Sequence, residues 1–219
     1  MRSSRARALA ALLTLALLLV AAAEAALAEA PRTRFNRTDQ AAARTAVLKK
    51  ADLGSGWTGG VKKGAVHAPT SCAGWKPKQA DLVITGVAES EYSAQGAYVY
   101  SSVQVYKTKQ MVALDWRRTV IGMPMRCLSQ ELAKGAGEQL KLVSTRRMPF
   151  PKLAPYTARF RVVADYNGDH AARMVIDAVA VGRGRTGVTI GLVAPYAQRA
   201  EADAAEVRLA RIVLARIKR

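Results

Sequence analysis

Hydrophobic and polar residues alternate with a period of two along much of the second half of the chain, which is typical of β-strands. The clearest pair is residues 156–166 and 171–181, joined by Asn167-Gly168, the strongest short signal for a hairpin turn. The same pattern predicts further strands over residues 82–88, 97–107, 139–147 and 186–194. Because the last strands are joined by connections of hairpin length, we expect a mainly antiparallel sheet.

In other stretches the apolar residues recur at helical spacing. We expect helices over residues 39–50, 109–121, 126–134 and 196–218. Thr38 is the expected N-cap of the first, Pro124 ends the second, and Pro195 opens the last. The apolar side of the last helix is expected to carry Ala200, Ala204, Val207, Leu214 and Ile217.

The connection between the first helix and the first strand is rich in glycine and proline. Four glycines surround Trp57, which predicts a turn around one buried aromatic anchor, and residues 61–78 are expected to be mainly loop. Taken together, the elements predict one α+β domain over residues 39–219, in which helices cover a mainly antiparallel sheet.

The first residues have the order of a secretory signal peptide: basic, then apolar, then small. Arg2, Arg5 and Arg7 precede the apolar run 8–23, and Ala26-Leu27-Ala28 offers a cleavage site. The run is shorter than the ~20 residues that span a bilayer, so cleavage near Ala28 is favoured over an uncleaved anchor. No cysteine occurs at that site, so we expect a secreted protein that is not a lipoprotein, with residues 29–38 as a disordered lead-in.

The chain is strongly basic, with 34 Lys and Arg against 16 Asp and Glu, a net charge of +18. Such a charge favours contact with an anionic envelope component, at the membrane or wall surface. The other explanation is the codon bias of a GC-rich genome, which adds arginine without selecting for a partner. Export argues against nucleic acid as the partner. With two His and two Cys, we expect no metal site and no cofactor, and we expect a monomer.

Cys72 and Cys127 are the two cysteines of the chain. Exported proteins retain disulfides, and a bridge between these positions would stabilise the fold by roughly 4 kcal/mol on the chain-entropy model. A reactive thiol or a metal pair is the alternative, but neither cysteine lies in a CxxC motif or beside a histidine. A disulfide is therefore the prediction.

The predicted hairpin gathers several arginines on one face. Arg159, Arg161 and Arg173 fall on its two strands, on the face that also carries Asp177. Grouped guanidinium groups bind carboxylate or phosphate, so these residues are the best candidates for an anion site. The alternative is that the arginine stems cover the sheet while their charged ends reach water.

Two further groups are candidates for a binding role. Arg183 and Arg185 flank Gly184 in a short turn and are either an anion clamp at the sheet edge or solvated turn residues. Tyr98, Tyr100 and Tyr106 share one face of a predicted strand and are expected to lie in the core or line a cleft.

The sequence shows no clear catalytic motif. A serine hydrolase needs a nucleophile and a histidine base, but there is no G-x-S-x-G, and His67 and His170 both fall in predicted loops. Asp165, Asp169 and His170 lack the spacing of a calcium loop and indicate a polar turn. The enzyme alternative is a hydrolase with an unrecognised carboxylate pair, drawn from Asp115, Glu131, Asp165 and Asp177.

The segment Ala51-Asp52-Leu53-Gly54-Ser55-Gly56-Trp57-Thr58 resembles the DLP-x-GW opening of small exported actinobacterial-type domains. A Val-rich strand, a Trp-bearing helix and two cysteines some fifty residues apart follow it. In this order of features the chain is similar to the extracellular sensor domain of PknH-type serine/threonine kinases, which has a PsbP-like fold. The chain has no kinase domain and one cysteine pair where the kinase sensors have two, so kinase signalling is not implied.

What the resemblance implies is a PsbP-like sheet between helices and a cleft that binds a ligand or partner. We therefore expect an exported, non-enzymatic, sensor-like domain that binds an envelope component or a small amphiphile. Buried ionisable groups in one large pocket would favour the hydrolase, and an apolar pocket without them would favour the binding domain.

Overall fold

The computed structural model describes residues 30–67, 71–72, 74–94, 96–136, 140–167 and 171–217. The predicted signal peptide, its cleavage site near Ala28, and residues 168–170 of the predicted hairpin turn lie outside this range. No helix within it is both long and apolar enough to cross a membrane.

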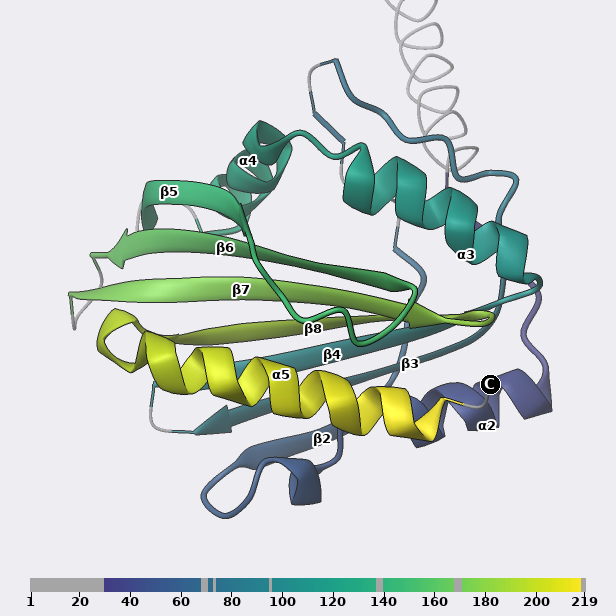
Figure 1. The fold of residues 1–219 in the computed structure, drawn as a ribbon, viewed down its shortest axis with the longest axis horizontal. Helices are drawn as coiled ribbons and strands as arrows, with labels where there is room; N and C mark the ends of the chain where they lie inside the picture. The colour runs from purple at the N-terminus through teal and green to yellow at the C-terminus, as the bar shows by residue number, and fades with distance from the viewer. Residues whose placement is uncertain are drawn as a thin grey trace, which may run out of the picture.

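Within the described residues, one sheet of eight strands forms the centre of the molecule (Figure 1). Its order is β1-β3-β4-β8-β7-β6-β5, and β2 also pairs with β3. The strands are β1 (Arg32–Thr33), β2 (Thr58–Lys63), β3 (Val83–Ala94), β4 (Ala97–Tyr106), β5 (Leu140–Met148), β6 (Tyr156–Tyr166), β7 (Ala172–Arg183) and β8 (Thr186–Pro195). Every pair is antiparallel except β1 with β3, which confirms the predicted α+β class and mainly antiparallel sheet.

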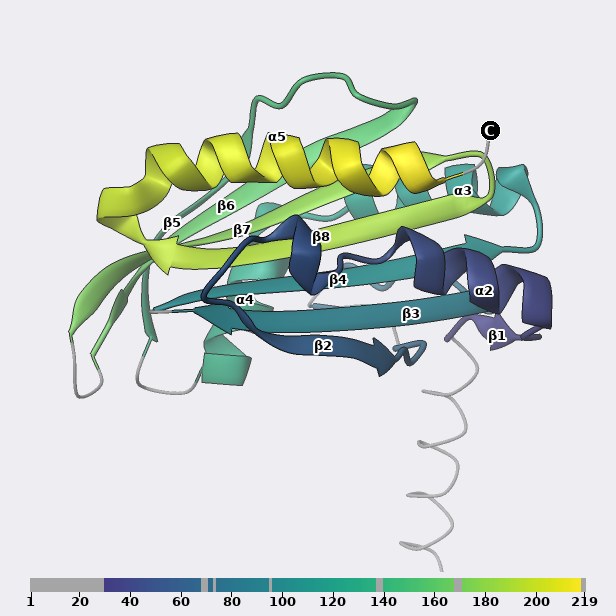
Figure 2. The same cartoon turned by 90° about the horizontal axis from the view of Figure 1, so that it is seen from below.

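Helices lie on both faces of the sheet (Figure 2). On one face are α2 (Arg37–Ala46) and α5 (Arg199–Arg216), and we call this the α5 face. On the other are α3 (Lys109–Asp115), the π-helical turn η2 (Trp116–Ile121) and α4 (Met125–Ala136), and we call this the α3 face. The short 3-10 turn η1 (Lys50–Asp52) follows α2, and a second one, η4 (Tyr196–Gln198), precedes α5.

The α5 face holds most of the hydrophobic core. Val188, Ile190 and Leu192 of β8 are all buried on it, because alternate residues of a strand face the same side. They pack with buried residues of α5 such as Leu209 and Val213. The dense apolar packing on this side makes it the main stabilising layer of the fold.

The phase of α5 differs from the prediction. Ala200 and Ala204 are exposed, Val207 is half-buried, and only Leu214 and Ile217 of the predicted stripe are buried. The helix instead buries Ala202, Glu206, Leu209, Ala210, Val213 and Leu214. An acidic residue, Glu206, therefore lies on the core side of the helix, which apolar spacing alone could not indicate.

The N-terminal segment also differs from the prediction. Residues 32–33 are not a disordered lead-in but a strand, whose backbone pairs with β3. Helix α2 begins after Asn36, not Thr38, since the Asn36 side chain accepts a hydrogen bond from the Asp39 amide at 2.9 Å. The helix ends at Ala46 instead of residue 50, and the Leu48 amide then donates to Ser101 Oγ in the sheet.

The region predicted as loop after Trp57 contains strand β2. Gly59 makes its pairing possible, because a Cβ at this position would lie 2.1 Å from the backbone oxygen of Glu91. β3 is accordingly longer than predicted, extending to Ala94. Trp57 packs against the core but is half-buried rather than buried, since its turn precedes a strand at the sheet edge.

The predicted disulfide between Cys72 and Cys127 is confirmed. It joins the segment before β3 to α4. Beside the bridge, the backbones of Cys72 and Trp75 exchange hydrogen bonds of 3.0 and 2.9 Å. The bridge and this small turn hold Trp75 on the α3 face.

Candidate functional site

A cavity of about 320 Å³ lies on the α3 face, between the sheet and the segment α3–η2. Small side chains on β7 and β8 create the space: Ala180 lies opposite Thr189, and Gly182 opposite Gly187. A Cβ on Gly187 would lie 3.6 Å from the Tyr106 ring, which rests beside this glycine. The cavity therefore exists because the side chains along one face of these two central strands are small.

The walls of the cavity are aromatic and apolar. Trp116 and Val120 come from η2, and Val112 from α3. Trp75 lines the cavity from the disulfide-bonded segment. The Trp116 ring packs against Tyr156 with ring centres 5.5 Å apart, which fixes its position. π-Helical turns recur at functional sites, because they shift side chains relative to an α-helix.

Asp115, at the end of α3, is the most highly connected polar residue of the cavity. Its carboxylate accepts hydrogen bonds from the Tyr106 hydroxyl at 2.7 Å, from Gln79 Nε2 at 2.5 Å and from the Thr119 hydroxyl at 3.2 Å. Burial raises the pKa of Asp115 despite these donors, and burial also raises the pKa of Tyr106 well above its ordinary value. The carboxylate thus ties α3 to β4 and to the segment before β3.

Glu89 of β3 lies next to the cavity floor and is 8% exposed. It is the direct cross-strand partner of Ser102, which lines the cavity. Its Oε1 atom is buried and has no hydrogen-bond partner, and His67 Nε2 lies 3.4 Å away. Burial, together with the nearby Glu89 carboxylate, raises the pKa of Tyr100 to about 12, although the Ser102 hydroxyl lowers it.

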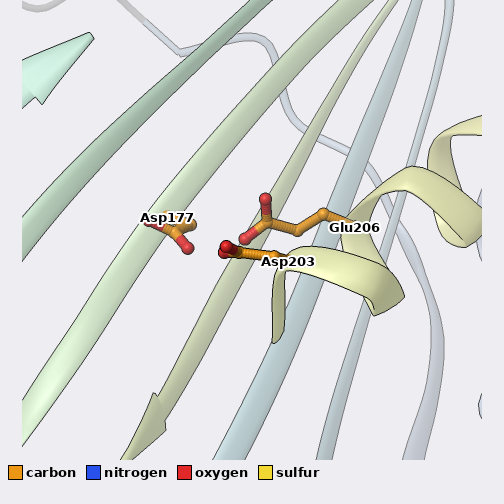
Figure 3. Close-up of side chains that lie close together, drawn as sticks. All are labelled: Asp177, Asp203 and Glu206. Carbon is orange, nitrogen blue, oxygen red and sulfur yellow. The ribbon is translucent and has the colours of Figure 1, made fainter. Parts of the chain in front are cut away.

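The predicted anion site is differently arranged. Arg159 and Arg161 are buried on the α5 face, where they meet Asp177 of β7 and Asp203 and Glu206 of α5. Figure 3 shows the three carboxyl groups pointing toward one another from the strand and the helix. We call these five residues the Arg159 cluster.

Close contacts link every member of the cluster. Arg161 Nε donates to Asp177 Oδ1 at 2.8 Å, and Arg159 Nη2 donates to Asp177 Oδ2 at 3.1 Å. Both guanidinium groups also donate to Asp203. Arg159 Nε lies 2.6 Å from Glu206 Oε2, a close contact that lacks hydrogen-bond geometry.

The acids of the cluster differ in the direction in which their pKa values are shifted. Burial, reinforced by the neighbouring Asp177 carboxyl, raises the pKa of Glu206 to about 9. Burial also acts to raise the pKa of Asp177, but the Arg161 guanidinium holds it below its ordinary value. At neutral pH two guanidinium groups thus face two carboxylates and one neutral acid, so the cluster is balanced internally.

The balance of charge within the Arg159 cluster decides whether the cluster is a binding site. Asp177, Asp203 and Glu206 offer carboxylate oxygens within 4.8 Å of one another, a spacing that suits a metal ion. The guanidinium groups of Arg159 and Arg161 already neutralise them. We therefore assign the cluster a structural role beneath α5.

The other arginine candidates are also engaged within the protein. Arg173 shares the strand face of Arg161 but lies at the end of β7, where it pairs with Asp165 at 2.7 Å on the surface. Arg185 binds Asp39 through two hydrogen bonds of 2.7 and 3.1 Å. Arg183 donates to the backbone oxygen atoms of Leu214 and Leu153. The structure brings Arg159 and Arg161 together and leaves the other three apart.

The structure separates the tyrosine candidates. Tyr106 lines the cavity, whereas Tyr98 and Tyr100 lie farther along the same face of β4 and are half-buried. His67, predicted to be a solvated loop residue, has a largely exposed side chain that nevertheless lines the cavity. His170, Asp169 and the side chain of Glu131 lie outside the described residues.

Sequence reasoning missed the cavity itself. Asp115 was a candidate acid, but nothing marked its contact with Tyr106 or placed Gln104, Ser102 and Thr189 around one space. The available signal was the run of small residues on one face of β7 and β8. A scan of protein-family models found no match to this chain, and a search of curated proteins found none.

Proposed function

We propose that this protein is an exported binding domain that holds a small ligand in the cavity on the α3 face. The cavity itself is the observation that carries the proposal. Its volume of about 320 Å³ is in the range of small-molecule sites, and it combines apolar and aromatic walls with a few polar groups. Export rests on the N-terminal sequence, and a sensor-like role on the resemblance to kinase sensor domains.

The alternative of a hydrolase finds some support in Asp115, a buried acid with a raised pKa in this cavity. A glycosidase needs a second carboxylate on the other side of the substrate. Among the described residues that line the cavity, Asp115 is the one carboxylate. Since it already accepts three hydrogen bonds, we give it the role of holding the cavity in shape.

Filling the cavity tests the proposal. Thr189→Phe places a ring on the cavity floor, at a side chain that is exposed to this space. We expect saturable binding of the apolar fluorescent probe N-phenyl-1-naphthylamine to the unaltered protein, and an affinity reduced about tenfold or more in the variant. The matched control is Thr58→Phe, at an exposed position of β2 outside the cavity.

Circular dichroism and a thermal unfolding midpoint establish that both variants are folded. Probe binding that is equally strong in Thr189→Phe and in the unaltered protein would contradict the proposal, because the probe would then bind elsewhere. Equal loss in both variants would contradict it too, since the effect would not depend on the cavity.

A further inference from the structure

The cavity has the opposite electrostatic character to the rest of the chain. The protein has 34 Lys and Arg residues, yet none of the described residues that line the cavity is a lysine or arginine. The acids of this region are Asp115 in the wall and Glu89 beside the floor. His67 is the one described lining side chain that can carry a positive charge, and it already faces Glu89, so a carboxylate or phosphate ligand would meet two acids and no unpaired cation.

Glu89 is the residue that indicates the charge of the ligand most specifically. Its Oε1 atom is buried and accepts no hydrogen bond, and such a carboxylate oxygen is costly to leave unsatisfied. The side chain lies on the α3 face, directly across from Ser102 of the floor. His67 Nε2, from the cavity wall, lies 3.4 Å from the unsatisfied oxygen. Glu89 does not line the cavity itself, but its carboxylate lies directly behind His67 and Ser102, which do, so its negative charge acts on a ligand from just beyond the wall.

The walls suit the same kind of ligand. The rings of Trp75, Trp116 and Tyr106 line the cavity, and aromatic faces attract cations through their electron-rich π-systems. Val112, Val120 and Met123 offer contact to apolar substituents. Resting on the proposed function, we infer that the ligand of this cavity is a small organic cation, an ammonium group with apolar substituents.

A matched pair of probes isolates the charge of the ligand. Choline and 3,3-dimethylbutan-1-ol have nearly the same shape, but only choline carries a positive charge. In isothermal titration calorimetry we expect choline to bind about tenfold or more tightly than the neutral alcohol, because only the cation gains from Glu89 and the aromatic rings. Equal affinity for the two, or tighter binding of the alcohol, would overturn the inference.

A matched pair of variants tests the role of Glu89. Glu89→Gln keeps the shape of the side chain and removes its charge. Glu91→Gln makes the same change two residues along β3, at a partly exposed side chain that pairs with Lys62 outside the cavity. We expect Glu89→Gln to remove most of the preference for choline over the alcohol, and Glu91→Gln to preserve it. Equal preferences in the two variants would contradict the assignment of Glu89.

The failure of this inference differs from the failure of the proposed function. If N-phenyl-1-naphthylamine binds in a manner that Thr189→Phe abolishes, but choline shows no advantage over the alcohol, the cavity is a binding site and the ligand class is wrong. If Thr189→Phe leaves the fluorescent probe bound, the proposed function itself is wrong. The probe comparison uses the unaltered protein, so it decides the ligand class even if Glu89→Gln folds poorly.

Discussion

The same strands form both faces of the sheet, but the two faces have different roles. On the α5 face, β8 presents Val188, Ile190 and Leu192, which are buried under α5. On the α3 face, the alternate residues of the same strand are Gly187 and Thr189, which form the floor of a cavity. Strand alternation thus separates the layer that stabilises the fold from the surface that is free to bind.

The two faces also differ in the partners that surround their buried charged groups. Each ionised side chain of the Arg159 cluster faces an opposite charge at close range. On the α3 face, Glu89 Oε1 is buried without a hydrogen bond. Buried atoms without a hydrogen bond occur on both faces, since Arg159 Nε and both carboxyl oxygens of Glu206 also lack one. The difference is that the atoms of the Arg159 cluster lie against one another inside the protein, whereas Glu89 lies beside a cavity.

The largest expected effect comes from breaking the Arg159 cluster. Two carboxylates contact both guanidinium groups, and Asp177→Asn removes the fully buried one, so that buried positive charge is left poorly compensated. We expect the free energy of unfolding to fall by about 3–5 kcal/mol in denaturant titrations. Asp165→Asn is the control, since it breaks only the surface pair with Arg173 and should leave stability almost unchanged. Similar losses would show that the cluster is not a buried network.

Substitutions at two neighbouring residues of β8 compare the stability contributions of the two faces directly. Ile190 is fully buried on the α5 face, so Ile190→Ala should lower the free energy of unfolding by about 2–5 kcal/mol. Thr189, on the α3 face, is exposed to the cavity, and Thr189→Ala should change stability by no more than about 0.5 kcal/mol. A large loss at Thr189 would mean that the α3 face is packed and not hollow.

The pH dependence of the Arg159 cluster is a further test of its charge balance. The pKa of Glu206 is raised from 4.5 in the unfolded chain to about 9 in the folded protein. The unfolded chain therefore holds fewer protons between these values, and the contribution of Glu206 to stability is full below pH 4.5 and lost as pH rises toward 9.

Glu206→Gln isolates this contribution, because the amide resembles the neutral acid and does not ionise. We expect the variant to be close to the unaltered protein in stability at pH 5 and relatively more stable at pH 9. Urea unfolding of both proteins at each pH measures the difference. Parallel pH profiles would mean that Glu206 is already ionised in the folded protein.

The sequence predicted most of the regular structure, because strand alternation and turn residues are local signals. The hairpin of β6 and β7 follows from such signals, since Asn167-Gly168 marks its turn in the sequence. The strand β2 did not, since Gly59 and Gly60 have low strand propensity and pairing with β3 decides their conformation.

The chemistry was less predictable than the fold, because it depends on contacts between distant segments. Arg161 and Asp177 were predicted to share a face, and they do. Their burial depends on Asp203 and Glu206 of α5, far along the chain, whose charges obscured the phase of that helix. The cavity depends on missing bulk at Ala180, Gly182 and Gly187, which the hydrophobic pattern does not register.

The central claim, that the α3 face holds a small ligand, is tested most directly by native mass spectrometry of the protein purified after export. The account predicts that the unaltered protein carries an additional non-covalent mass, and that Thr189→Phe, purified in the same way, lacks it because the ring occupies the cavity floor. The same additional mass on both proteins, or none on the unaltered protein, would contradict the account.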